Sequence, residues 1–233
     1  MKIIQLSLFV GLTALSLTAA EPPHRAPSID QAPAPLTVGV PVTSILNQTP
    51  DQSLFGWSDA GCGGCSQGAQ VIAENVLVNT GGVGFDLDQI VVWGVYANTS
   101  LPPVDNFSVL IHADSGGLPG TIICSQTGLV PTSRIATGNT VGSFPEYMVT
   151  LDLATACHLT DGTHWIEVFN NTDGEIADWG WESGNTDPGN GLPGVAWSTV
   201  APGASWANDP SFNAAIQLNG TLLPVELQSF SIE

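Results

Sequence analysis

One segment, residues 161–182 with the sequence DGTHWIEVFNNTDGEIADWGWE, constrains the fold more than any other part of the chain. Its two arms flank the turn formers Asp173 and Gly174, which predicts a β-hairpin. Successive side chains of a strand point to opposite faces, so Trp179 and Trp181 lie on the same face of the second arm. The segment therefore predicts β-structure with two large aromatic side chains placed together.

The rest of the chain, from about Gln52 to Gly220, alternates short apolar runs with turn clusters at intervals typical of an antiparallel sandwich. No run has helical periodicity, and no repeat of fixed length is evident in the sequence. We therefore predict an all-β fold, a single antiparallel β-sandwich that is jelly-roll-like. The expected strands cover residues 70–78, 85–97, 106–113, 121–125, 146–153, 163–170, 175–182, 195–198 and 213–218. The run QIVVWGVYA is apolar on both faces, which predicts a central strand with Trp93 in the core.

The ends of the chain have a different composition. Residues 1–20 combine one lysine, an apolar run and small residues before Glu21, which is typical of a secretory signal peptide. A membrane anchor is the alternative, although the run falls short of the ~20 apolar residues that a spanning helix needs. Residues 21–51 are rich in proline, which predicts an exposed linker or an edge segment. We expect the sandwich at residues 52–221 and a C-terminal strand or tail at residues 222–233.

The charge of the chain excludes two classes of partner. The formal net charge is -18, and of the three basic residues Lys2 belongs to the signal peptide, which leaves Arg25 and Arg134. Nucleic-acid binding depends on Lys and Arg side chains that displace counterions from phosphates. Neither nucleic acid nor an anionic membrane surface is therefore an expected partner, and no membrane insertion is expected after signal cleavage.

Four cysteines are present in a chain that is expected to be exported, which favours disulfides. Three pairings are possible, and we favour Cys62–Cys65 together with Cys124–Cys157. A thioredoxin-like role for the CGGC motif is the alternative, but that chemistry uses a helix N-terminus within a βαβ unit.

The sequence contains no recognisable catalytic motif. His112, His158 and His164 have no recognisable nucleophile motif beside them, and there is no G-x-S-x-G or H-E-x-x-H pattern. Asp178 and Glu182 share a strand face but stand about 13 Å apart, farther than either glycosidase mechanism uses. We therefore expect no catalytic activity and no cofactor, and a hydrolase with an unrecognised acid pair stays the weaker alternative. Binding of a metal by His158, His164 and Asp161 is a further alternative to two unrelated histidines.

Two kinds of ligand fit the residues. Acidic turns offer the hard oxygen ligands that Ca²⁺ prefers, so a single structural calcium is one hypothesis. The acids of these turns are Asp114, Asp173, Glu175 and Asp187.

The second kind of ligand is a sugar ring stacked on tryptophan. Trp179 and Trp181 form either such a platform or part of the inner sheet core, and Trp197 and Trp206, in loops rich in proline and glycine, are better candidates for an exposed surface. The polar residues expected to hydrogen-bond sugar hydroxyls are Asp178, Glu182 and Asn185.

The succession of several short motifs resembles the β-sandwich modules of exported bacterial proteins. These motifs are Trp93-Gly-Val-Tyr96, Asp114-Ser-Gly-Gly-Leu-Pro-Gly120, Gly162-Thr-His-Trp165 and Ala214-Ala-Ile-Gln-Leu-Asn-Gly220. The resemblance implies a fold and no catalytic residue. Residues 223–230, LPVELQSF, are similar to the short strand that often precedes C-terminal sorting domains in secreted bacterial proteins. Because the chain stops three residues later, we expect release into the medium or periplasm.

These inferences leave two functions open. The first is a non-catalytic extracellular module for adhesion or carbohydrate binding, with a glycan or a surface protein as partner. The second is a structural component of the cell surface or matrix that has no small ligand.

Overall fold

The computed structural model describes residues 42–62, 68–97, 101, 104–171 and 178–223. The chain divides into two units, Met1–Gly39 and Val40–Glu233, and every described residue belongs to the second unit. The described residues form β-strands and no helix. The strands are β1 (Thr43–Gln48), β2 (Pro50–Trp57), β3 (Val71–Val78), β4 (Phe85–Ala97), β5 (Phe107–Asp114), β6 (Pro119–Leu129), β7 (Ser133–Val141), β8 (Phe144–Leu159), β9 (Gly162–Asn170), β10 (Asp178–Gly184), β11 (Gly191–Ser198), β12 (Ala207–Asp209) and β13 (Ile216–Leu222).

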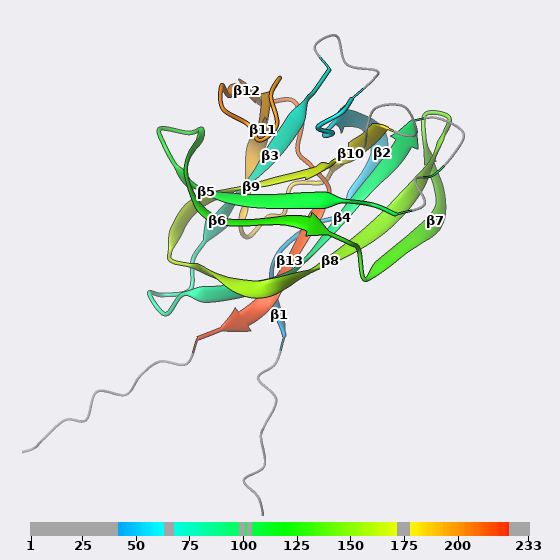
Figure 1. Ribbon diagram of the computed structural model, residues 1–233. Helices are drawn as coiled ribbons and strands as arrows, with labels where there is room; N and C mark the ends of the chain where they lie inside the picture. The colour runs from blue at the N-terminus through cyan, green and yellow to red at the C-terminus, as the bar shows by residue number, and fades with distance from the viewer. Residues whose placement is uncertain (1–41, 63–67, 98–100, 102–103, 172–177, 224–233) are drawn as a thin grey trace, which may run out of the picture. The chain divides into compact units, whose positions relative to one another are not determined.

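These strands build two antiparallel sheets, one of seven strands and one of six within the described residues. In the seven-stranded sheet, β8 pairs with one edge of β4, while β13 and β10 pair with different parts of its other edge. Farther out, β1 pairs with β13, and β2 pairs with β10. The six-stranded sheet has the order β12-β11-β3-β9-β5-β6. Figure 1 shows β5, β6 and β9 crossing in front of β4, β8 and β13. The predicted all-β, antiparallel β-sandwich is confirmed, with β4 as a central strand.

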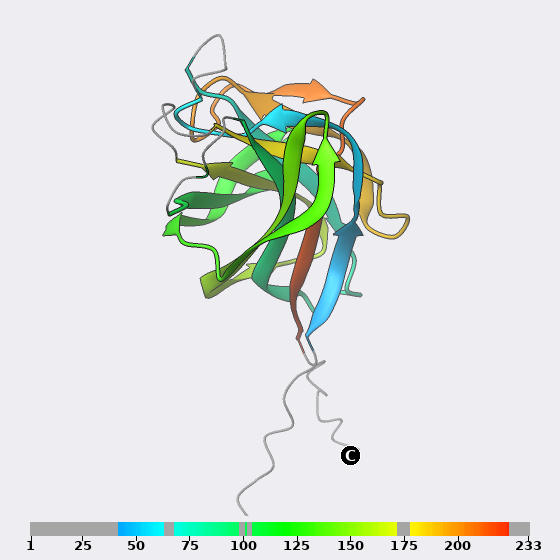
Figure 2. The same ribbon diagram turned by 90° about the vertical axis from the view of Figure 1, so that its right-hand side faces the viewer.

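The first strand begins before the expected boundary of the sandwich. β1 starts at Thr43, inside the proline-rich segment, and pairs with β13 as an edge strand (Figure 2). Its sequence TSILNQ contains no proline, so every residue of the strand can donate its backbone N–H. Strands β2, β7 and β12 were not expected, because most of their residues are exposed or half-exposed and form no apolar pattern. Residues 1–41 and 224–233, including the expected signal peptide and most of the LPVELQSF segment, lie outside the described residues.

The predicted hairpin at residues 161–182 is wrong. β9 belongs to the six-stranded sheet and β10 to the seven-stranded sheet, so the chain changes sheets between them. Both edges of β9 are already occupied, by β3 and by β5, and β10 is in the same way enclosed between β4 and β2. A strand has only two edges, so neither of these inner strands can also pair with the other.

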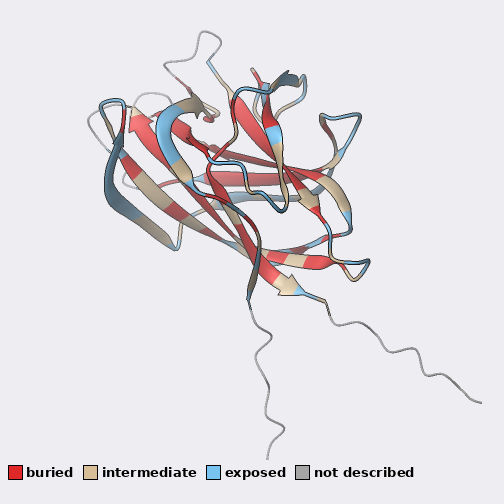
Figure 3. Ribbon diagram, turned by 180° about the vertical axis from the view of Figure 1, so that it is seen from behind, coloured by how far each residue is buried: buried red, intermediate tan, exposed pale blue. Residues whose placement is uncertain are grey.

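The core lies between the sheets, and buried residues concentrate along the central strands (Figure 3). Trp179 and Trp181 point into this core and are fully buried, with the Trp179 ring 5.1 Å from that of Phe107. Gly94 makes room for them, because a Cβ there would stand 2.7 Å from Trp179 Nε1. Trp93, expected in the core, lies half-buried on the outer face of β4, since its neighbours take the inward positions.

One disulfide joins the two sheets. Cys124 of β6 and Cys157 of β8 are bonded with a Cα–Cα distance of 6.1 Å, as predicted. Beside it, Gln126 binds the β8 backbone, donating to the Thr155 carbonyl at 2.7 Å and accepting from the Ala154 N–H at 2.7 Å. Cys62 is buried and disulfide-bonded, and its expected partner Cys65 lies outside the described residues. No helix in the described part of the chain is long and apolar enough to cross a bilayer.

Candidate ligand-binding site

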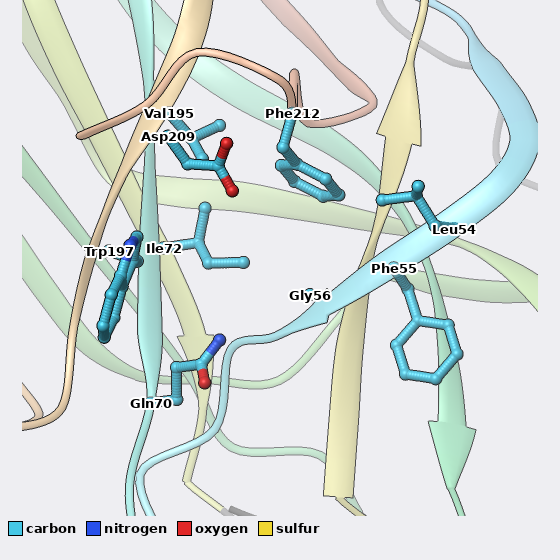
Figure 4. A pocket seen from close by; sticks show the side chains of 9 residues that line it. All are labelled: Leu54, Phe55, Gly56, Gln70, Ile72, Val195, Trp197, Asp209 and Phe212. Atoms are coloured by element: carbon cyan, nitrogen blue, oxygen red, sulfur yellow. The ribbon is translucent and has the colours of Figure 1, made fainter. Parts of the chain in front are cut away.

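A hollow opens at the side of the sandwich where β2 of one sheet faces β11 of the other (Figure 4). Its volume is about 350 Å³, which lies at the lower end of the ~300–1,000 Å³ typical of small-molecule sites. We call it the edge hollow. It is lined by Leu54, Phe55, Gly56, Gln70, Ile72, Val195, Trp197, Asp209 and Phe212.

Side chains of β2 point alternately to its two faces, and those on one face form a wall of the edge hollow. Leu54 and Gly56 face the hollow, whereas the ring of Phe55 points to the far side of β10 (Figure 4). Gly56 brings the two sheets close together at this point, because a Cβ there would meet Ile72 Cδ1 at 2.5 Å. Ile72 and Val195 are buried members of the sandwich core, so the hollow has an apolar floor that is formed before any ligand binds.

Trp197 forms the opposite wall. It pairs with Ile72 across the β11–β3 ladder, and the two neighbours of Trp197 in β11 are buried on the other face of the sheet. The residue is 36% exposed, and its ring stands edge-on beside Ile72 in Figure 4. A partly exposed indole is a suitable partner for the apolar face of a sugar ring.

Two polar groups line the same hollow. Asp209 Oδ1 accepts hydrogen bonds from the Ser211 hydroxyl at 2.6 Å and from the Ser211 N–H at 3.0 Å. These bonds lower the pKa of Asp209, which keeps the carboxylate ionised. Gln70 pairs with Asp59 through its backbone, and its side-chain amide makes no hydrogen bond with the described residues. The hollow therefore offers both donors and acceptors beside an aromatic wall.

The four tryptophans considered for sugar binding lie in three different places in the structure. Trp179 and Trp181 are core residues with no accessible indole face. Trp206 is half-buried, with its ring 5.8 Å from that of His112. It packs on residues of the outer face of the six-stranded sheet, opposite to the inner face on which Trp197 lies. Trp197 and Trp206, the two candidates for an exposed surface, therefore lie on opposite faces of the six-stranded sheet.

The polar residues predicted to surround the tryptophans also lie elsewhere. Asp178 and Glu182 point from β10 to the outer face of the seven-stranded sheet, away from Trp179 and Trp181, and both are buried. Asn185 is exposed just after β10 and binds the Thr49 carbonyl through its N–H at 2.8 Å. None of the three lines the edge hollow.

An acid pair is nevertheless present, with a different partner. Glu182 lies beside Glu146 of β8, and Gln52 of β2 hydrogen-bonds to both carboxyls. Burial and the neighbouring Glu146 raise the pKa of Glu182 to about 8. Burial opposes ionisation of Glu146 too, but hydrogen bonds that include those from Thr137 and Gln52 lower its pKa. Both side chains are at most 1% exposed, so a substrate has no access to them in this arrangement.

The histidines are held in separate places. His112 Nε2 lies 2.8 Å from Glu167 Oε2 beneath Trp206, and both residues are buried. His158 Nδ1 lies 2.9 Å from Asp86, whereas His164 Nε2 bonds the Thr160 carbonyl at 2.8 Å. The alternative metal site of His158, His164 and Asp161 is not assembled, because Asp161 accepts hydrogen bonds from Thr80 and Gly82 instead.

The acids proposed for calcium are partly described. Asp114 accepts from the Trp165 indole at 2.9 Å and from the Gly117 N–H. Asp187 accepts from backbone N–H groups of its own turn and from the Asn47 N–H at 2.9 Å. Asp173 and Glu175 lie outside the described residues. Within the described ranges, no group of three or more His, Cys, Asp or Glu residues could hold a metal ion.

No protein-family model matches the chain, and no curated protein sequence matches it significantly.

The edge hollow was only partly visible in the sequence. Trp197 was singled out because it is a large aromatic in a Pro/Gly-rich region, but Leu54, Gln70 and Asp209 carried no signal. The hollow arises where the edge strands of two sheets meet, and this proximity depends on strand order, which local patterns do not encode.

Proposed function

We propose that the chain is an exported, non-catalytic β-sandwich module that binds neutral carbohydrate in the edge hollow. The observation that carries the proposal is the placement of Trp197, 36% exposed against a preformed apolar hollow that also contains a carboxylate and a side-chain amide. Aromatic faces with a few convergent polar groups are the usual elements of small-molecule recognition. Binding of a surface glycan would serve adhesion as well.

The charge of the protein supports a neutral ligand. With a formal net charge of -18 and three Lys or Arg residues in the whole sequence, the protein repels uronic acids and sulfated sugars. Asp209 adds a local negative charge at the hollow, where it can accept hydrogen bonds from sugar hydroxyls. Neutral hexoses and N-acetylated sugars therefore fit this site better than anionic polysaccharides.

Export is supported by two features. Disulfides such as Cys124–Cys157 form and persist in oxidising compartments. The N-terminal residues have the composition of a signal peptide.

A pull-down with insoluble neutral polysaccharides tests the function. The protein is incubated with cellulose, chitin and starch granules, and Trp197→Ala and Trp206→Ala are the matched variants. We expect retention on at least one polymer, loss of retention with Trp197→Ala, and wild-type retention with Trp206→Ala. Absence of retention on all three polymers, or equal loss in both variants, would contradict binding in the edge hollow.

A structural role by self-association is the second candidate, and the exposed edge strand β6 favours it. β6 ends the six-stranded sheet, contains no charged residue, and carries Ile122 and Ile123 at 50% and 44% exposure. An uncharged edge strand with exposed isoleucines is a template for pairing with another chain. Sedimentation velocity over a range of concentrations tests this role, with Ile123→Lys as the variant expected to abolish association. A monomer at all concentrations would exclude it.

A further inference from the structure

Glu146 and Glu182 lie in a small buried compartment on the outer face of the seven-stranded sheet. Glu146 comes from β8 and Glu182 from β10, and β4 runs between these two strands. β2 contacts β7 across this face, and the rings of Phe55 and Phe144 stand 5.7 Å apart. The compartment is thus closed by β2, the same strand that forms one wall of the edge hollow.

Gln52 of β2 binds both acids. Its backbone N–H donates to Glu182 Oε1 at 3.0 Å, and its side-chain amide donates to Glu146 Oε2 at 2.9 Å. Gln52 has a φ of 57°, a left-handed conformation that non-glycine residues seldom adopt. A single residue of β2 therefore connects the two carboxyls, at the cost of an unfavourable backbone conformation.

The surroundings of the pair favour one negative charge and not two. Glu182 faces Glu146 from β8 and the nearby Asp51 from β2, while β4 presents the uncharged Trp93 and Val95. From β7, the uncharged Thr137 and Asn139 bind Glu146. Asp178 lies on the same face of β10, nearer its start.

No cation compensates these acids among the described residues. Arg134, the only Lys or Arg in the described ranges, pairs with Asp105 at 2.7 Å on the inner face of β7. Glu182 Oε2 is buried and receives no N–H or hydroxyl donor from the described residues. Two adjacent carboxyls without a cation ionise in two steps, since the first charge opposes the second. A proton shared between the two acids would therefore be bound at Glu182 Oε2, the oxygen that receives no other donor.

We infer that Glu146 and Glu182 form a latch in which one shared proton joins the two carboxyls, and that β2 loosens from the sheet when this proton is lost. Glu182 and Phe55 are register partners across the β10–β2 ladder, so repulsion between the acids acts directly on β2. Because Leu54 and Gly56 of β2 line the edge hollow, the latch controls the wall of the ligand site. The consequence for binding rests on the proposed function, whereas the latch itself does not.

Hydrogen–deuterium exchange tests the latch without a ligand. Peptides covering Pro50–Trp57 are followed at about pH 6.5 and about pH 9.5, after correction for the intrinsic pH dependence of amide exchange. We expect protection of β2 in the wild type to fall roughly tenfold or more at the higher pH, because the folded and loosened states bind different numbers of protons. Protection in β3 serves as the internal reference.

Three variants make the result specific. Glu182→Gln keeps the shape of the protonated acid and can donate to Glu146, so we expect β2 to stay protected at the higher pH. Glu146→Gln removes one of the two charges and should reduce the pH effect. Asp152→Asn alters an exposed acid of β8 that accepts from Gln89, and should behave as the wild type. Unchanged protection in the wild type, or an equal fall in Glu182→Gln, would overturn the latch.

Polysaccharide retention at the two pH values then connects the latch to the ligand site. If a polymer is retained, we expect weaker retention at the higher pH in the wild type and equal retention at both pH values in Glu182→Gln. Retention that is independent of pH in the wild type would refute control of the site by the latch. Absence of retention at both pH values contradicts the proposed function alone, and the exchange experiment still decides the latch.

Discussion

Glu182 and Phe55 lie opposite each other across the β10–β2 ladder, on the face of the sheet opposite to the core residues Trp179 and Trp181. On this outer face Phe55 packs edge-to-face against Trp57 at 5.0 Å and Phe144 at 5.7 Å. Its ring lies over Gly180, where a Cβ would collide with Phe55 Cδ2. β2 therefore has one face toward the acid pair and one toward the edge hollow.

The contact between Phe55 and Gly180 leads to a prediction about packing. We expect Gly180→Ala to lower the free energy of unfolding by about 1–3 kcal/mol, because the added methyl overpacks the site. In the Phe55→Ala background the same change should cost less, since the clashing ring is absent. Urea denaturation of the two single variants and the double variant measures the coupling. Additive costs would show that the ring does not determine the need for glycine.

A second prediction concerns the pH dependence of stability. Burial and the neighbouring Glu146 raise the pKa of Glu182 from its ordinary value of 4.5 to about 8 in the folded protein. Between these values the folded state binds more protons than the unfolded state, so the free energy of unfolding falls as pH rises, and levels off above about pH 8. The lowered pKa of Glu146 makes the free energy of unfolding rise with pH instead, but only at pH values below the ordinary pKa of a glutamate, outside this range.

Glu182→Gln isolates this contribution. Burial also raises the pKa of Glu74, so Glu74 too makes the free energy of unfolding fall as pH rises, and the informative quantity is the difference between variant and wild type. We expect this difference to shift in favour of the variant from about pH 5 to about pH 8 in chemical denaturation. A difference that stays constant with pH would show that Glu182 does not keep its proton.

Asp105 provides a third prediction. Its carboxylate accepts from Arg134 at 2.7 Å, Tyr96 Oη at 2.8 Å and Asn170 Nδ2 at 3.0 Å, and so connects the two sheets. Asp105→Ala removes the acceptor that these donors share, and we expect a loss of about 3–5 kcal/mol in the free energy of unfolding. Asp105→Asn retains an acceptor oxygen and should lose less. A cost for the alanine variant within experimental error of zero would show that this buried cluster contributes no stability.

The disulfide between β6 and β8 gives the fourth prediction. Its sequence separation of 33 residues corresponds to a stabilisation of about 3–4 kcal/mol through loss of chain entropy in the unfolded state. A variant with Cys124→Ala and Cys157→Ala should therefore unfold at a clearly lower denaturant concentration. If reduction of the wild type and the double substitution both leave the midpoint unchanged, the cross-link does not stabilise the sandwich.

Local patterns were sufficient to predict most of the strands and not their partners. The apolar run of Phe85–Ala97 predicted a central strand with the correct bounds, because a strand that is buried on both faces has a nearly continuous apolar sequence. Thr43–Gln48 was assigned to a linker since neighbouring prolines dominate its surroundings. β9 and β10 were predicted to pair because they are adjacent in sequence, whereas each already has two partners within its own sheet.

The candidate sites show the same limit. Trp197 was a candidate from its residue type, but its separation from Trp206 depends on which face of β11 each ring covers. Glu182 was paired with Asp178 on its own strand, while its neighbour in the structure is Glu146 of β8. Such juxtapositions follow from the register of β4 with β8 and β10, and a single sequence contains no measure of that register.

The most direct test of carbohydrate binding is a titration of the protein with a soluble oligosaccharide of the retained polymer, followed through the indole N–H resonances in ¹H–¹⁵N correlation spectra. Trp197→Phe assigns the resonance of the candidate residue, and Trp206→Phe assigns that of the control. Binding in the edge hollow predicts a saturable shift of the Trp197 resonance while the Trp206 resonance stays in place. A saturable shift of the Trp206 resonance with the Trp197 resonance unchanged would contradict binding in the edge hollow.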